Sequence, residues 1–124
     1  MRWETLSLPT DLDQEQFLYL TTRGRKSGRP RRIEIWFTQR TAGSQKPRFY
    51  IIAEYPTANW VQNIRAHPAV QVRVAGQSFS AHARVICATD EPSLNHAVQE
   101  LSRQKYGWGD GLVVELIPAD DSSL

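Results

Sequence analysis

The stretch from residue 17 to residue 38 reads FLYLTTRGRKSGRPRRIEIWFT and contains two candidate strands joined by a basic turn. Its start is short, apolar and aromatic, which is typical of a strand. From residue 32 onward, Ile33, Ile35 and Phe37 alternate with Glu34 and Trp36, as in a strand that is buried on one face. Glycine and proline occur between the two segments, as in a turn. The stretch therefore predicts a β-hairpin.

Outside this hairpin, apolar residues recur with strand or helix spacing. Strands are expected over residues 48–54, 70–74, 79–87 and 112–117. A short helix is expected around Trp60 and Ile64 with Thr57 as its N-cap, and a longer one between Asp90 and Gly107. Six short strands with mostly hairpin-length connections indicate a mainly β chain of the α+β class, in the form of a small β-barrel or a curled antiparallel sheet. A doubly wound fold would need more helices between its strands.

The length of 124 residues corresponds to one domain, since a domain usually takes roughly 100–200 residues. We expect an arm or short helix over residues 1–14, a barrel domain over residues 15–118 and an acidic tail over residues 119–124. The chain would then contain two or three helices.

Composition excludes several classes of protein. The single cysteine, Cys87, excludes an intramolecular disulfide framework. The three histidines are scattered without the spacing of metal ligands, so no metal site is expected. No signal peptide is visible, and no stretch approaches the roughly 18 apolar residues of a membrane span. A cytoplasmic protein without an integral membrane segment is therefore expected.

The distribution of charge is more informative than the formal net charge of +2. Of the 15 lysines and arginines, six fall between Arg23 and Arg32, and no acidic residue occurs between Glu15 and Glu34. The like charges of such a block repel one another, and a folded protein tolerates them when an anion screens them or when water solvates them fully. Gly24 and Gly28 let the backbone turn and expose N–H groups, which suit phosphate together with arginine and lysine.

Three interpretations fit this basic loop: a solvated surface loop, a contact for nucleic acid, or a site for a phosphate or carboxylate of a small molecule. Nucleic acid is the weakest of the three, because the net charge is near zero and no nucleic-acid-binding signature is present. The string GRKSG, residues 24–28, is not a P-loop. From the residues alone, the ligand class stays open between phosphate and carboxylate.

Two motifs carry a family resemblance. LTTRGRKSGRPRR, residues 20–32, is followed about thirty residues later by NWVQNIRAHPAVQV, residues 59–72. Together they resemble the deazaflavin-dependent nitroreductase family, over roughly residues 17–118. The resemblance implies a split β-barrel like that of FMN-binding flavin reductases and pyridoxamine-phosphate oxidases. It also implies an oxidoreductase that uses reduced coenzyme F420, with FMN as the alternative cofactor, to reduce a small quinone, nitro compound or activated alkene.

The resemblance also implies site residues. The basic loop would hold the phosphate and oligoglutamate tail of the cofactor, and the following strand, the end of the next strand and a W-x-x-N helix would line its ring. The cofactor-binding residues implied in this way are Arg25, Lys26, Ser27, Arg31, Arg32, Ile33, Glu34, Trp36, Ala53, Tyr55, Trp60 and Asn63. Tyr106, in the YGWG segment at residues 106–109, is the candidate catalytic residue that would polarise or protonate the substrate.

The chain departs from the family pattern at two places. Several relatives carry a lysine just after the third strand, where this chain has Glu54, and many have a Pro-Leu pair at Glu34-Ile35. Alternatives stay open for single residues: Trp60 would equally suit the core, and Tyr106 would suit a place at the end of the last helix. A non-catalytic flavin, deazaflavin or haem-binding protein of the same fold is the second hypothesis. The wider superfamily also suggests a homodimer.

Overall fold

The computed structural model describes residues 12–41 and 46–119. Most of the expected N-terminal arm and nearly all of the acidic tail therefore lie outside the described residues. The elements are a short 3-10 turn η1 (Leu12–Gln14), strands β1 (Phe17–Arg23), β2 (Pro30–Trp36), β3 (Thr38–Arg40), β4 (Arg48–Ala53), β5 (Ala69–Val74), β6 (Gln77–Val85) and β7 (Leu112–Pro118), and helices α1 (Asn59–Ala66) and α2 (Pro92–Tyr106).

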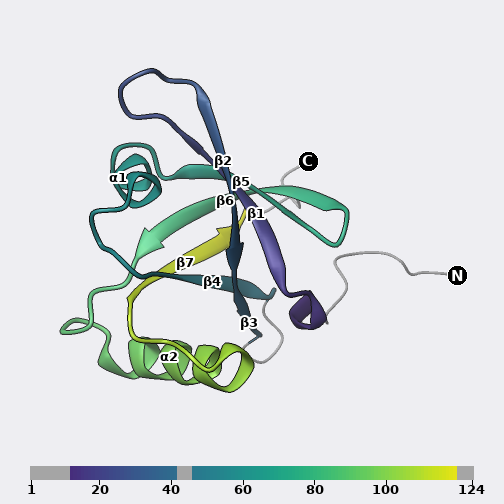
Figure 1. Ribbon diagram of the computed structural model, residues 1–124, viewed down its shortest axis with the longest axis vertical. Coiled ribbons are helices and arrows are strands. Elements are labelled where there is room, and N and C mark those ends of the chain that lie inside the picture. The colour runs from purple at the N-terminus through teal and green to yellow at the C-terminus, as the bar shows by residue number, and fades with distance from the viewer. Residues whose placement is uncertain (1–11, 42–45, 120–124) are drawn as a thin grey trace, which may run out of the picture.

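The seven strands form one antiparallel sheet in the order β2-β1-β5-β6-β7-β4-β3. The sheet curls into a half-barrel, with α1 near one end and α2 across the other (Figure 1). β1 and β2 pair over their full length, from Phe17 opposite Trp36 to Arg23 opposite Pro30. The hairpin and the mainly β barrel predicted from the sequence are thus confirmed.

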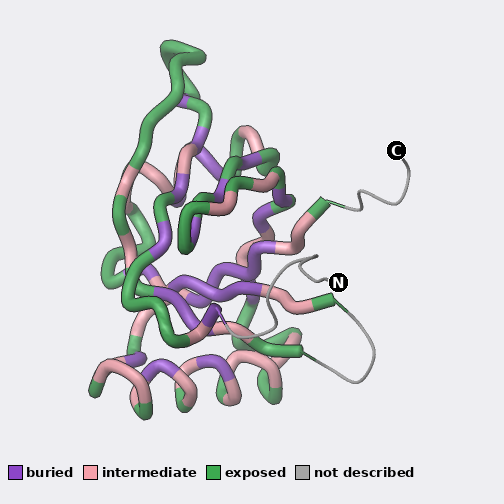
Figure 2. The backbone as a smooth tube through the Cα atoms, turned by 90° about the vertical axis from the view of Figure 1, so that its right-hand side faces the viewer, coloured by how far each residue is buried: buried purple, intermediate pink, exposed green. Residues whose placement is uncertain are grey.

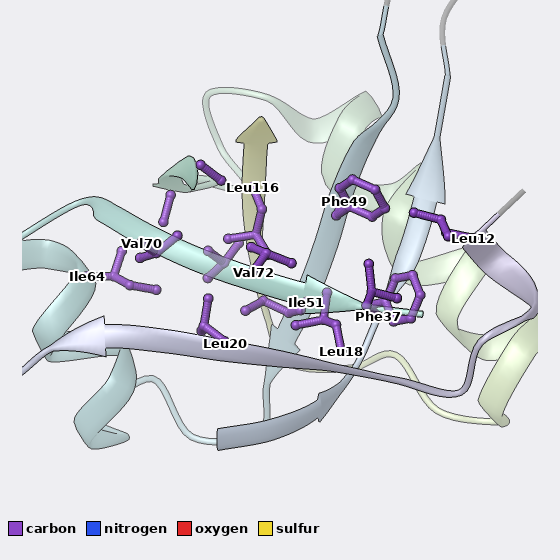
Figure 3. Close-up of a cluster of buried hydrophobic side chains, with 14 residues drawn as sticks. Leu12, Leu18, Leu20, Phe37, Phe49, Ile51, Ile64, Val70, Val72 and Leu116 are labelled. Carbon is purple, nitrogen blue, oxygen red and sulfur yellow. The ribbon is translucent and has the colours of Figure 1, made fainter. Parts of the chain in front are cut away.

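The core lies inside the curl of the sheet, where side chains from β1, β4, β5 and β7 point toward one another (Figure 3). Along β1, buried Leu18 and Leu20 alternate with exposed or half-exposed neighbours. Each fully buried leucine or isoleucine stabilises the fold by about 1.5–3 kcal/mol. Because buried residues alternate with exposed ones along each strand, this stabilisation determines which face of the strand turns toward the core.

Several local expectations are corrected. β3 was not expected, because a strand of three residues is too short to show an alternating pattern. Thr57 is not the N-cap: α1 begins at Asn59 after Ala58, without a side-chain cap. β6 ends at Val85, so Cys87 is exposed rather than packed in the core. Gly107 does end α2, with a left-handed φ of 81°.

A buried charged cluster joins strands β4, β6 and β7. Glu115 on β7 is 1% exposed and accepts hydrogen bonds from Tyr50 Oη at 2.8 Å and Arg84 Nε at 3.0 Å. Arg48 pairs with the same carboxylate at 3.3 Å, and Arg84 also binds Glu91. Because a buried carboxylate is stable only when it is paired, Arg48 on β4 and Arg84 on β6 offset the burial of Glu115 on β7.

No helix within the described residues is long and apolar enough to cross a membrane. Nor do residues 12–41 and 46–119 contain a group of three histidine, cysteine or acidic side chains that would hold a metal ion.

Candidate functional site

Two adjoining cavities lie along β2 and α1, and both include Trp60 in their walls. The first, of about 490 Å³ and here called the basic cavity, is lined by Thr22, Gly24, Arg25, Lys26, Ser27, Arg31, Ile33, Asn59, Trp60 and Asn63. The second, of about 590 Å³ and here called the aromatic cavity, is lined by Phe17, Glu34, Ile35, Trp36, Phe37, Thr38, Tyr50, Ile52, Ala53, Glu54, Tyr55, Ala58, Trp60, Ser102 and Trp108. Both volumes fall in the range of small-molecule sites.

The hairpin loop between β1 and β2 projects away from the barrel and is largely exposed (Figure 2). Two backbone hydrogen bonds of 2.8 Å close it, from Gly24 N to the Arg29 carbonyl and from Gly28 N to the Gly24 carbonyl. Gly28 has a φ of +74°, which glycine adopts without strain. Ser27 Oγ accepts from Arg29 N at 3.1 Å, so its oxygen already serves the turn.

Asn63 on α1 anchors this loop to the barrel. Its Oδ1 accepts from both the backbone N and Nη1 of Arg25 at 3.1 Å, and its Nδ2 donates to Thr22 Oγ1 at 3.1 Å. The side chain is 4% exposed. Asn63 therefore holds Arg25 at the wall of the basic cavity.

The positive charge of the basic cavity is not neutralised by carboxylates. Within the described parts of the chain, Arg25, Lys26 and Arg31 form no ion pair with a carboxylate. Arg32 lies elsewhere: its guanidinium sits 4.2 Å from the centre of the Tyr19 ring, and it lines neither cavity.

Two residues in the wall of the aromatic cavity, Trp36 and Trp108, are supported by contacts with residues of α2. The Trp36 ring stacks on Tyr106 with ring centres 4.4 Å apart and planes 4° from parallel. The loop that carries Trp108 is fixed to α2, because Ser102 Oγ donates to the Trp108 carbonyl and Gln99 Nε2 donates to the Gly111 carbonyl. Flat rings supported in this way suit a flat ligand.

The Tyr106 hydroxyl is directed to the backbone. It accepts from Phe37 N at 3.0 Å and lies 2.7 Å from the Gln16 carbonyl and 2.8 Å from the Phe37 carbonyl. Since a hydroxyl has one proton, it donates to one of these carbonyls at a time. Tyr106 does not line either cavity.

The aromatic cavity also contains polar groups, and Thr38 is one that the sequence did not single out. Thr38 is buried at 3% exposure, and its Oγ1 is without a hydrogen-bond partner among the described residues. Glu34 and Glu54 line the same cavity and are exposed. Thr38 begins β3, which is too short to show a periodicity that would mark this residue as part of a site.

A family model for F420H2-dependent quinone reductases matches residues 2–110, which is most of the chain. The chain belongs to the F420H2-dependent quinone reductase family. This family consists of oxidoreductases, in agreement with the resemblance seen in the sequence. No curated protein matches the sequence significantly.

Solved structures show the same fold at low sequence identity. A haem storage protein from Vibrio cholerae, HutZ, is 19% identical with a TM-score of 0.69, covering 89% of this chain and 87% of its own. An F420H2-dependent reductase, FDR-A, is 17% identical with a TM-score of 0.63, covering 82% and 93%. An FAD-binding protein from Mesorhizobium loti is 13% identical with a TM-score of 0.67, covering 88% and 85%. These similarities confirm the FMN-binding-like split barrel.

The structure gathers most of the residues that the family resemblance implied. The basic cavity includes Arg25, Lys26, Ser27, Arg31, Ile33 and Asn63, the aromatic cavity includes Glu34, Trp36, Ala53 and Tyr55, and Trp60 belongs to both. Arg32 and Tyr106 lie outside. Trp60 therefore faces the cavities as well as packing against the core.

Proposed function

We propose that this protein binds reduced coenzyme F420 across the two cavities and reduces a small quinone, nitro compound or activated alkene. The proposal rests on one observation. The basic cavity, whose cations form no ion pair, adjoins the aromatic cavity, and Trp60 lines both. An anionic tail with a flat ring at one end has the matching shape and charge. FMN, which also joins a phosphate to a flat ring, is the alternative cofactor.

The cationic residues and the aromatic residues would bind different parts of the coenzyme. Arg25, Lys26 and Arg31 would bind the anionic tail with charge-assisted hydrogen bonds. Trp36 and Trp60 would wall the ring, and each stacked contact contributes on the order of 1 kcal/mol. When bound, the reduced coenzyme supplies a hydride, which together with a proton from water converts a quinone to a hydroquinone and leaves the coenzyme oxidised.

Tyr106 receives a positioning role in this proposal. Its hydroxyl is engaged with the backbone of Phe37, and its ring supports Trp36 from outside the cavity. It would therefore hold the aromatic wall in place without donating a proton to the substrate.

A fluorescence titration tests cofactor binding. Oxidised and reduced coenzyme F420 are expected to quench the tryptophan fluorescence of the purified protein to saturation. The double variant Lys26→Ala/Arg31→Ala should raise Kd at least about tenfold, because each lost charged hydrogen bond costs about 1.5–3 kcal/mol. Its matched control is Arg29→Ala/Arg32→Ala, which removes the same charge from residues outside both cavities and should change Kd less than about threefold. Absence of saturable quenching in the wild type, or equal losses in the two variants, would refute the proposal.

A second candidate is a carrier of flavin, deazaflavin or haem that does not turn over. Haem is disfavoured because haem iron is commonly held by histidine, and no described histidine lines either cavity. Steady oxidation of reduced coenzyme with a quinone or nitro acceptor distinguishes an enzyme from a carrier, which would bind without oxidation. A cytoplasmic location and a homodimer stay predictions.

A further inference from the structure

The two cavities carry opposite charge. Arg25, Lys26 and Arg31 line the basic cavity, whose described walls include no carboxylate. Glu34 and Glu54 line the aromatic cavity, whose described walls include no lysine or arginine. The protein therefore presents a cationic end and an anionic end on either side of Trp60.

Neither carboxylate is neutralised by a neighbour. Over residues 12–41 and 46–119, Glu34 and Glu54 form no ion pair and no side-chain hydrogen bond. Arg32, two residues from Glu34 on β2, instead lies over the Tyr19 ring at 4.2 Å. Both carboxylates are therefore available to a ligand in the aromatic cavity, and Glu34 also borders a third cavity that contains Arg73.

Aromatic faces lie in the same cavity wall. Trp36 is 39% exposed and Tyr55 is 64% exposed, so their rings are accessible to a bound molecule. The face of an aromatic ring attracts cations, and carboxylates beside it add Coulomb attraction. This combination is typical of sites that recognise organic cations.

We propose that Glu34 and Glu54 make the aromatic cavity select electrophilic acceptors that carry a positive charge beside a flat ring system, over neutral or anionic acceptors of the same shape. The inference rests on the proposed function and adds that the acceptor lies against the coenzyme ring in the aromatic cavity. It narrows the substrate class from small electrophiles in general to cationic aromatic electrophiles.

Binding without coenzyme provides the first test. Calorimetry at pH 8 compares three flat probes that share one ring system: the cation 1-methylquinolinium, neutral 4-methylquinoline and anionic quinoline-4-carboxylate. We expect the cation to bind about tenfold more tightly than the neutral probe at low salt. The anion should bind most weakly in Lys26→Ala/Arg31→Ala, where the basic cavity no longer attracts its carboxylate. In 0.5 M NaCl the preference should shrink, because exposed charges are screened.

Variants that remove negative charge test whether the preference for the cationic probe depends on Glu34 and Glu54. Glu34→Gln/Glu54→Gln should reduce the preference for the cation to within about twofold. The matched control Asp90→Asn/Glu100→Gln removes the same charge from exposed residues that line neither cavity, and should keep the preference. Equal affinity for all three probes, or a preference that survives loss of Glu34 and Glu54, would overturn the inference.

Turnover provides a second, independent test. Naphthoquinones that carry a methyl, a sulfonate or a trimethylammonium-methyl group at the same ring position are compared as acceptors. Since the ratio of kcat/KM between wild type and Glu34→Gln/Glu54→Gln cancels the intrinsic reactivity of each quinone, it reports the effect of the carboxylates alone. The ratio should be about tenfold higher for the cationic quinone than for the neutral one, and below the neutral value for the anionic one.

The outcomes separate this inference from the proposed function. If coenzyme F420 fails to bind but the quinolinium preference depends on Glu34 and Glu54, only the proposed function fails. If reduced coenzyme is oxidised by all three quinones and the carboxylates make no difference, the proposed function stands and the charge selection is wrong.

Discussion

At the scale of single residues, two buried threonines differ by one hydrogen bond. Thr22 Oγ1 accepts from Asn63 Nδ2, whereas Thr38 Oγ1 has no partner among the described residues. Both are less than 4% exposed. A buried polar group without a partner opposes folding, whereas one with a partner does not.

The same substitution should therefore have opposite effects at these positions. Thr38→Val is expected to raise the free energy of unfolding by about 1 kcal/mol, because it removes an unpaired hydroxyl without changing shape. Thr22→Val should lower it by about 1–3 kcal/mol, because Asn63 Nδ2 is left unsatisfied. Urea denaturation measures both. A loss of stability in Thr38→Val would mean that its hydroxyl has a partner in the folded protein.

Tyr106 offers a second residue-scale prediction. Tyr106→Phe keeps the ring that stacks on Trp36 and removes the hydroxyl bound to Phe37 and Gln16. We expect the free energy of unfolding to fall by about 1–3 kcal/mol while kcat stays within a few-fold of wild type. A drop in kcat of about 10²–10⁴-fold with unchanged stability would instead identify Tyr106 as the proton donor.

At the scale of elements, the sequence predicted those whose signals are local. The β1–β2 hairpin and α2 carry alternation, turn residues and a C-terminal glycine within their own residues. β3 and the start of α1 carry no such signal, and both were missed. The loop after α2 depends on distant neighbours: a Cβ at Gly111 would lie 2.0 Å from the Ala53 carbonyl oxygen. Only glycine permits this approach, which brings the loop carrying Trp108 against β4.

At the scale of the whole molecule, the cluster around Glu115 should make stability depend on pH. Burial, followed by the hydrogen bond to Glu115 and its charge, raises the pKa of Tyr50 from 10.0 to about 12. Between these values the folded protein keeps a proton that the unfolded chain has lost. The stabilisation is therefore fully present below pH 10 and is lost as the pH rises toward 12.

A comparison of wild type with Tyr50→Phe isolates this effect. From pH 10 to pH 12 the wild type should lose about 2–3 kcal/mol of unfolding free energy relative to the variant, as a shift of two pKa units requires. Urea denaturation at intervals over this range gives the two curves. Parallel curves would show that Tyr50 titrates normally in the folded protein.

The sequence by itself determined the hairpin, the barrel class and the cationic loop, because alternation, turn chemistry and charge density are properties of neighbouring residues. It also carried the family motifs that contain Trp60 and Asn63. Only the tertiary structure decided that Arg32 turns away to Tyr19, and that Tyr106 binds the backbone 69 and 90 residues away. It also decided that Glu34 on β2 and Glu54, which directly follows β4, share one cavity. These relations arise from how a curled sheet and two helices pack, so no local pattern in the chain encodes them.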